Sequence, residues 1–132
     1  MPDVIDDAVK NLAQGPNFAA LTTALPGGAF QTNVMWVDCD DEHLLINTEV
    51  HRQKYKNVSR DPRVTVAIWD QANPYHYAEV RGRVESTTTG PEARAHIDHL
   101  SRKYTGSDYD ASAIQSERVI LRIAPERQRH QA

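Results

Sequence analysis

Short runs of apolar and β-branched residues, separated by turn-forming residues, recur along the whole chain. Such runs predict strands, and alternation of polar and apolar positions predicts strands with one buried face. We expect six strands, at residues 18–24, 29–37, 44–48, 64–69, 75–85 and 118–123, with Pro125 ending the last. Because strands and helices do not alternate regularly, the pattern favours a small antiparallel barrel over a doubly wound sheet. Gly82 marks a position where a bulge would let the barrel close.

Helical spacing of apolar residues predicts three helices among these strands. The first would be capped by Asp3, would bury Val4, Ile5, Ala8, Val9 and Leu12, and would end at Gly15-Pro16. The second would run from His51 to Ser59, between two strands. The third would begin at Gly90-Pro91 and bury Ala93, Ile97 and Leu100. The expected fold class is therefore mainly β with α.

The 132 residues fit a single domain, 1–132, with one core. Apolar residues make up 39% of the chain and charged residues 25%, and no apolar run approaches the roughly 20 residues needed to cross a bilayer. The first residues lack the basic start and apolar core of a secretion signal, and the single Cys39 cannot form an internal disulfide. We therefore expect a cytoplasmic protein without membrane insertion.

The second predicted helix concentrates positive charge in a chain of net charge -3. Arg52, Lys54, Lys56, Arg60 and Arg63 all fall within twelve residues. Its first N–H groups follow a strand end, and helix N-termini favour anions by roughly 0.3–1 kcal/mol. This corner suits a phosphate group; the alternative is a solvated surface helix.

The segment Arg52-Gln53-Lys54-Tyr55-Lys56-Asn57, continued to Asp61-Pro62-Arg63, resembles a segment of the flavin and deazaflavin oxidoreductases. These enzymes form the pyridoxamine-phosphate-oxidase-like split-barrel superfamily, and the chain looks most like the branch that uses the deazaflavin coenzyme F420. The resemblance also covers residues 33–38, 73–75 and 79–84. It implies a split β-barrel and a homodimer with the coenzyme between the subunits.

Residues that match the family's coenzyme-binding positions fall into three groups. Arg52, Lys54 and Asn57, with Lys56 beside them, match positions that bind the anionic tail. Asn33, Val34, Met35 and Trp36, together with Asn47, Thr48 and Glu49, match positions along the ring system. Tyr77, Trp69 and Tyr75 match aromatic positions that the partner chain often supplies, and dimer packing alone would explain them equally well.

The resemblance also implies the chemistry. A reduced deazaflavin would pass a hydride to an unsaturated small-molecule substrate, and Tyr77, Tyr75, His51 or solvent could supply the proton, so no general acid is assigned. FMN-using relatives carry an Arg-x-x-Leu-Leu-Lys phosphate motif that this chain lacks, which favours F420 as cofactor over FMN. A coenzyme carrier without turnover would show the same residues.

Other site types are disfavoured by the sequence. Asp38, Asp40 and Glu49 have the spacing of calcium ligands, but their segment lacks the central glycine of a calcium-binding loop. His96, Asp98 and His99 lie close together on the third predicted helix, but the sequence offers no clear third ligand beside the two histidines. We therefore expect no metal. Cys39 lies among acidic residues, which would raise its pKa and make it a poor nucleophile. Binding of nucleic acid is disfavoured by a pI near 6.0.

Overall fold

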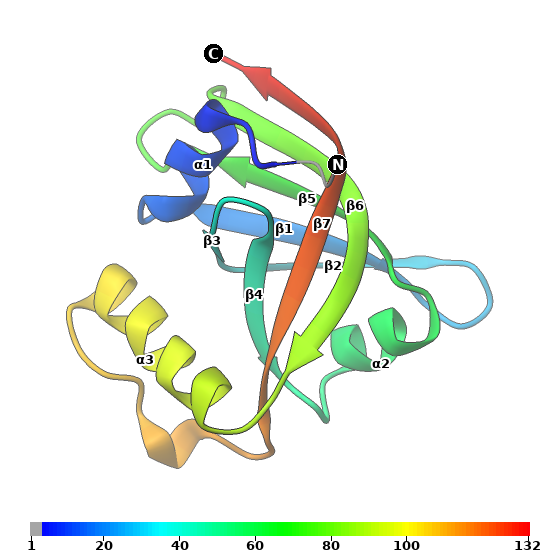
Figure 1. The fold of residues 1–132 in the computed structure, drawn as a ribbon, viewed down its shortest axis with the longest axis vertical. Coiled ribbons are helices and arrows are strands. Elements are labelled where there is room, and N and C mark those ends of the chain that lie inside the picture. The colour runs from blue at the N-terminus through cyan, green and yellow to red at the C-terminus, as the bar shows by residue number, and fades with distance from the viewer. Residues whose placement is uncertain (1–3) are drawn as a thin grey trace.

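The computed structural model describes residues 4–132, which form one curled antiparallel sheet with helices around it (Figure 1). The strand order is β2-β1-β5-β6-β7-β4-β3. The strands are β1 (Phe18–Ala24), β2 (Phe30–Trp36), β3 (Asp38–Cys39), β4 (Leu44–Glu49), β5 (Arg63–Trp69), β6 (Tyr77–Thr88) and β7 (Arg118–Gln131). The expected mainly β class with a split barrel is confirmed, and β3 is a short strand that the sequence pattern did not predict.

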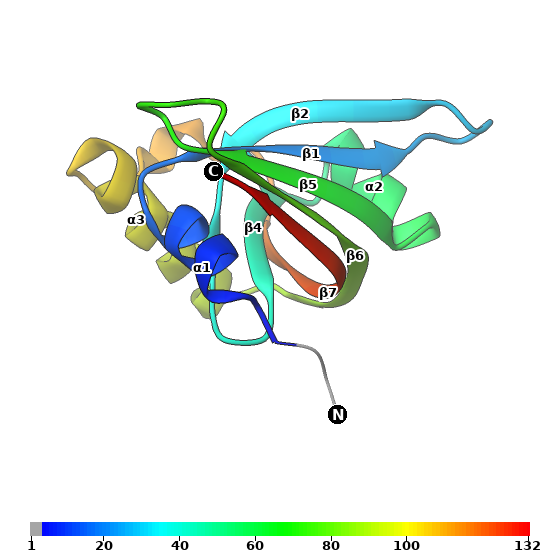
Figure 2. The ribbon, with the colours of Figure 1, turned by 90° about the horizontal axis from the view of Figure 1, so that it is seen from above.

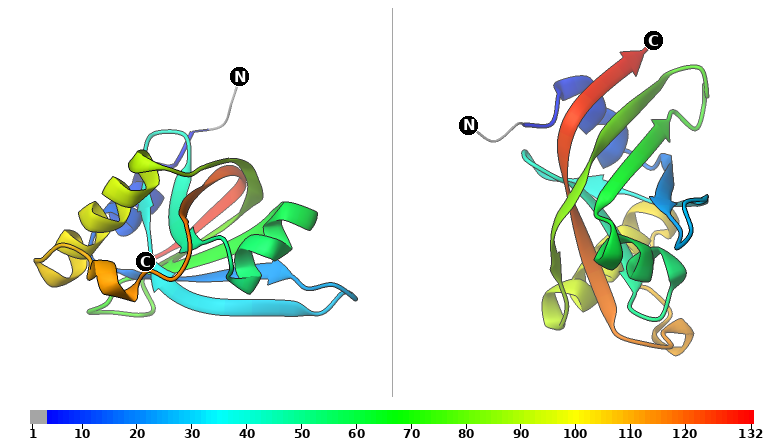
Figure 3. Two further views of the ribbon diagram at one scale, coloured as in Figure 1. Left: turned by 90° about the horizontal axis from the view of Figure 1, so that it is seen from below. Right: turned by 90° about the vertical axis from the view of Figure 1, so that its right-hand side faces the viewer.

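The sheet curls until β1 and β2 pass across the end of β4 (Figures 2 and 3). Inward positions alternate along β1, β5 and the first half of β6, which fills the barrel with aliphatic side chains. The fully buried members include Leu21, Leu44, Ile46, Val66, Val80 and Leu121. One continuous core therefore holds the two sides of the half-barrel together.

The pairing of β6 with β7 is interrupted by a bulge at Gly82. The register shifts between Arg81 and Gly82, where Gly82 lies opposite Pro125, and a Cβ on Gly82 would come 2.1 Å from the Ala124 carbonyl oxygen. The prediction of a bulge at Gly82 is thus confirmed. The prediction that Pro125 ends the last strand is wrong, because proline is tolerated at a bulge and β7 continues to Gln131.

Helix α1 (Asp7–Gln14) packs on the open side of the barrel. Val9, Leu12 and Ala13 of α1 are buried, as is Ile5 just before it, so Ile5, Val9 and Leu12 are buried as predicted, whereas Val4 is exposed and Ala8 is half-buried. The proposed cap Asp3 lies outside the described residues. No helix in residues 4–132 combines the length and apolar character needed to span a membrane.

Two other helices lie on opposite sides of the lower ends of β4 and β7 (Figure 1). Helix α2 (Gln53–Arg60) follows β4 as predicted, and α3 (Pro91–Thr105) lies beside β4 and β7. A 3-10 helix at Ala111–Ala113 then leads into β7. The strand predicted from residue 75 begins only at Tyr77, because residues 70–76 form a turn held by Asp70 and Asn73.

Candidate functional site

A cleft of about 430 Å³ opens where β2, β4 and the start of β7 meet α2 and α3. It brings together nine of the residues predicted to bind a coenzyme: Asn33, Val34, Met35, Trp36, Asn47, Thr48, Glu49, Arg52 and Lys54. Five further residues complete the lining: Phe18, Ile97, Leu100, Tyr109 and Arg118. Segments distant in sequence thus converge on one concave surface.

The floor of the cleft is a hydrogen-bonded group of polar side chains from β4 and β7. Arg118 donates from Nε to Asn47 Oδ1 at 2.8 Å, and its guanidinium lies 3.5 Å from Glu49. Antiparallel pairing sets Glu49 opposite Arg118, so the two strands hold this pair in place. Both side chains are buried, which fixes the position of one cation at the base of the cleft.

Glu49 is ionised and fully engaged within the protein. Burial opposes its charge, but the backbone N–H groups of Ser116 and Gln115 at 2.8 and 2.6 Å, together with Arg118, outweigh burial and lower the pKa of Glu49. Its hydrogen bonds tie the loop before β7 to the end of β4. Glu49 therefore shapes the cleft and leaves three cations, Arg52, Lys54 and Arg118, facing one carboxylate.

Lys54 is the most unusual cation of the cleft. Its side chain projects from the first turn of α2 and is only 6% exposed. Burial, followed by the charges of Arg52 and Arg118, lowers the pKa of Lys54 to about 8. Within residues 4–132 no carboxylate forms an ion pair with its ammonium group. An anion bound in the cleft would supply the missing counter-charge.

Aromatic rings form the opposite wall. Trp36 stacks on Tyr104 with centroids 5.1 Å apart and meets Tyr109 edge-on at 6.2 Å. The Arg118 guanidinium lies 5.2 Å from the Tyr109 ring centroid. Tyr104 donates its hydroxyl proton to the Asn17 carbonyl, and burial raises the pKa of Tyr104 to about 12, so this ring stays neutral and anchored. The wall offers a rigid flat surface beside the cationic floor.

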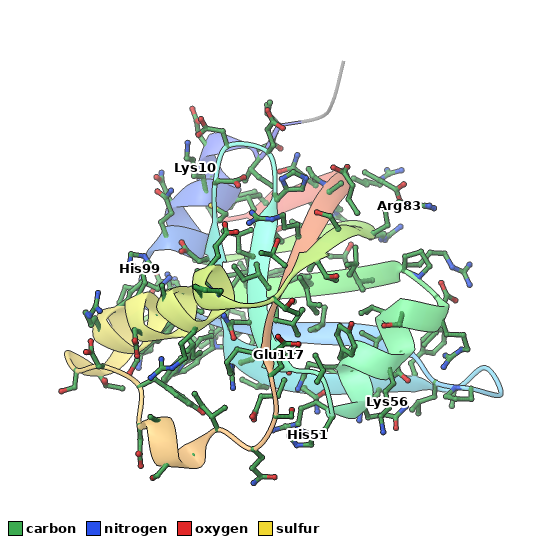
Figure 4. All side chains as sticks on the ribbon, turned by 60° about the horizontal axis from the view of Figure 1, so that its bottom comes forward. Lys10, His51, Lys56, Arg83, His99 and Glu117 are labelled. Atoms are coloured by element: carbon green, nitrogen blue, oxygen red, sulfur yellow. The ribbon has the colours of Figure 1, made fainter. Side chains whose placement is uncertain are left out.

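Two predicted tail-binding residues of α2 lie outside the cleft lining. Asn57 is fully buried and donates to Thr23 Oγ1 at 3.0 Å and Gln31 Oε1 at 3.3 Å, while accepting from Gln53 at 2.8 Å. The bonds to Thr23 and Gln31 attach α2 to β1 and β2. Lys56 lies on the exposed face of the same helix (Figure 4).

The remaining predicted residues also lie away from the cleft lining. Trp69 ends β5 and lies near Phe18, with ring centroids 6.5 Å apart. Tyr77 begins β6 and lies opposite Trp69 in the β5–β6 pair. Tyr75 is 82% exposed in the turn before β6. His51 sits at the α2 end of the molecule with its Nδ1 2.5 Å from Ser116 Oγ (Figure 4).

Sequence reasoning missed Arg118, Tyr109 and Phe18. Arg118 comes directly before the apolar run of residues 119–121, and a charged residue at such a position is a usable signal once its pairing with Glu49 is known. Tyr109 lies in the loop of residues 106–117, where no periodicity exists to place a side chain.

Residues considered as metal ligands or nucleophiles have other uses. In the described part of the chain, no three His, Cys, Asp or Glu side chains are arranged to hold a metal ion. Asp40 accepts from the N–H groups of Glu42 and His43 and so closes its own turn. Burial and Asp38 raise the pKa of the Cys39 thiol to about 12, which makes it inert.

Comparison with known proteins identifies a matching family and related solved structures. The family described as pyridoxamine 5'-phosphate oxidase matches residues 5–132. Among solved structures, an F420 reductase is 33% identical, with 95% of this chain and 98% of that chain covered and a TM-score of 0.83. None of the curated proteins compared with the chain matches it.

Two more distant structures share the fold. A conserved hypothetical protein from Mycobacterium tuberculosis is 23% identical over 98% of this chain and 86% of that chain, with a TM-score of 0.67. A putative pyridoxamine 5'-phosphate oxidase from Listeria innocua is 21% identical over 90% of each chain, with a TM-score of 0.64.

Proposed function

Because the chain belongs to the pyridoxamine 5'-phosphate oxidase family, we propose that it is an oxidoreductase that uses F420 to reduce an unsaturated small molecule. The F420 reductase with 33% identity supports this coenzyme over FMN, as does the absence of the Arg-x-x-Leu-Leu-Lys motif. FMN chemistry in the same cleft is the second candidate, because the matched family is named for an oxidase of pyridoxamine 5'-phosphate.

The observation that carries the proposal is the buried Lys54, which has no ion-pair partner among residues 4–132, beside a flat aromatic wall. A coenzyme with a planar ring and an anionic tail fits both features. Arg52 and Lys54 would hold the tail, since charge-assisted hydrogen bonds are worth about 1.5–3 kcal/mol each. Asn33 to Trp36 and Asn47 to Glu49 would line the ring system.

The other two α2 residues predicted to bind the tail would have different roles. Asn57 would act indirectly, by fixing α2 so that Lys54 enters the cleft. Lys56 would contribute little, because its ammonium lies on the solvent side of the helix. The resemblance placed both residues in direct contact with the tail, and the cleft geometry supports a narrower binding set.

When bound, the deazaflavin supplies the hydride chemistry. The chain supplies position, charge and exclusion of water by the Trp36 wall. Among the titratable residues lining the cleft, Glu49 is ionised and the arginines stay protonated, whereas Lys54 and Tyr109 can give a proton. Because Lys54 would be held by the anionic tail, Tyr109 or solvent is the proposed proton source from within one chain.

We also propose that the working form is a homodimer. Phe30 and Val34 point outward from β2 and are 73% and 64% exposed, and Tyr75 and Tyr77 are exposed at the far end of the sheet. Covering these side chains with a second copy would remove apolar surface from water. A dimer would also allow Trp69, Tyr75 and Tyr77 of one chain to approach the cleft of the other. Size-exclusion chromatography with light scattering measures the mass in solution. We expect the mass of two chains for the wild type and of one chain for Val34→Glu, which would place a charge in the contact.

Fluorescence titration with F420 and, separately, FMN tests the coenzyme. The wild-type chain, Lys54→Ala and the matched control Lys56→Ala are compared at two salt concentrations. We expect saturable F420 binding, roughly tenfold or greater weakening in Lys54→Ala, less than about twofold change in Lys56→Ala, and weaker binding of FMN. Salt should weaken binding to the wild type more than to Lys54→Ala.

The outcomes separate the candidates. A preference for FMN would move the function to flavin chemistry, and binding of neither coenzyme would overturn the proposal. Where F420 binds, reduction of quinones and conjugated carbonyl compounds by the reduced coenzyme distinguishes an enzyme from a carrier, since a carrier would bind without turnover.

A further inference from the structure

A line of polar side chains connects the side of α3 that faces α1 to the floor of the cleft. It runs from Asp38 through His96 and Asn47 to Arg118. His99, one turn along α3 from His96, lies toward the α1 end of the molecule, away from His51 and Lys56 (Figure 4). The line therefore starts on a different surface from the one that opens into the cleft.

Asn47 is the central link, and its amide has one workable orientation. Its Oδ1 accepts from Arg118 Nε at 2.8 Å, and its Nδ2 donates to the Ala93 carbonyl at 3.0 Å and to His96 Nδ1 at 3.1 Å. Turning the amide over would place donor against donor at Arg118 and acceptor against acceptor at Ala93. The orientation of Asn47 and the position of Arg118 thus depend on each other.

The hydrogen bonds of Asn47 also determine which ring nitrogen of neutral His96 carries the proton. Because Nδ1 accepts from Asn47, the neutral imidazole carries its proton on Nε2. Nε2 is buried without a hydrogen-bond partner among the described residues and faces Asp38 Oδ2 at 3.6 Å. His96 is only 10% exposed, so its ring has little freedom to find other partners.

Loss of the acceptor nitrogen of His96 would loosen this arrangement. One N–H of Asn47 would then have no partner, and the amide would be held only by the Ala93 carbonyl and Arg118.

We propose that His96 is a positioning residue that holds Arg118 in the cleft by accepting a hydrogen bond from Asn47. His96 lies outside the cleft lining; loss of its acceptor nitrogen by mutation loosens Asn47 and with it the guanidinium, which weakens the binding of anionic coenzymes. The inference rests on the proposed function only in naming the ligand that Arg118 helps to bind.

Two variants separate this role from simple packing. His96→Leu fills the space but offers no acceptor, whereas His96→Asn places Oδ1 where the imidazole carries Nδ1 and does not titrate. We expect His96→Leu to bind F420 about three- to tenfold more weakly at pH 8 and His96→Asn to bind within about twofold of wild type.

A measurement on the protein without coenzyme keeps the inference independent of the proposed function. The Nε–H signal of Arg118 in ¹H–¹⁵N NMR spectra should be protected from solvent exchange in wild type and His96→Asn and exposed in His96→Leu. An Arg118 signal that is equally protected in His96→Leu and in the wild type would overturn the inference, even if F420 binds. Binding of no coenzyme with the NMR coupling intact would instead overturn the proposed function.

Discussion

The two faces of helix α2 carry the same kinds of residue in opposite environments. On the inner face, Lys54 is 6% exposed in the cleft and Asn57 is fully buried against β1 and β2. On the outer face, Lys56 and Ser59 are exposed to solvent. Residues two positions apart point to different sides of a helix, so a dense basic segment need not act as one surface.

The difference shows that burial, rather than charge count, marks the functional cation. A solvated lysine makes weak, screened interactions, whereas one held in a cleft loses hydration and depends on a ligand for its counter-charge. The buried charge of Lys54 thus lowers the free energy of unfolding of the ligand-free protein, and it favours binding of an anionic ligand. The following experiments test how far the two faces differ, beginning with the largest expected effect.

Replacing Asn57 with Ala should cause the greatest loss of stability on α2. The change removes three hydrogen bonds and leaves the buried Thr23 hydroxyl without its partner. We expect the free energy of unfolding to fall by about 2–3 kcal/mol, measured by urea denaturation. Ser59→Ala, on the outer face, serves as control and should change it by less than about 0.5 kcal/mol. Equal effects would mean that α2 is not anchored through Asn57.

Replacing Lys54 with Met should stabilise the protein while damaging its cleft. Methionine fills the same space without a buried charge, and the lowered pKa of Lys54 corresponds to a cost of about 1–3 kcal/mol at pH 7. We expect the free energy of unfolding to rise by that amount and F420 binding to weaken. A destabilised Lys54→Met protein would show that the ammonium group already has a stabilising partner.

The stability difference between wild type and Lys54→Met should depend on pH with a defined sign. Lys54 titrates near pH 8 in the folded chain and at its ordinary value of 10.5 in the unfolded chain. Between these values the unfolded chain binds more protons, so wild-type stability rises with pH. The advantage of Lys54→Met should therefore be full below pH 8 and shrink by pH 10. A constant difference would place the Lys54 ammonium in water.

Lys56→Glu should have the smallest effect of the series. Lys56 is exposed, so we expect stability to change by less than about 0.5 kcal/mol and F420 affinity by a few-fold at low salt, with the change disappearing at high salt. A loss of affinity that matches Lys54→Ala and persists at high salt would place the coenzyme tail on the outer face of α2.

Most of the barrel could be predicted from the sequence because its strands alternate or are continuously apolar. The bulge at Gly82 and the helix after Glu49 were also predictable, since both depend on local residue chemistry. The extension of β7 beyond Pro125 could not be predicted, because its residues are mostly exposed and show no apolar pattern. Its hydrogen-bonded pairing with β6, which is distant in sequence, keeps it extended.

The candidate site was predictable in its sequence-local parts. Residues 33–36 and 47–49 are brought together as the family resemblance implied. Arg118 and Tyr109 come from distant segments, and their places depend on strand pairing and on a loop without periodicity. Basic and apolar residues are mixed along α2, so the sequence does not show which side of the helix faces the cleft. Only the structure shows that Lys54 lies in the cleft and Lys56 in solvent.

The two ends of the sheet differ in a way that limits how copies of the chain can add to one another. One edge is the seven-residue β2, whereas the other ends in the two-residue β3, with α3 lying beside the rest of β4. Growth of a fibre by edge pairing needs two open edges on every chain. Pairing of β2 with β2 of a second copy uses the same edge of both chains, so this contact is complete at two chains and leaves no β2 edge for a third.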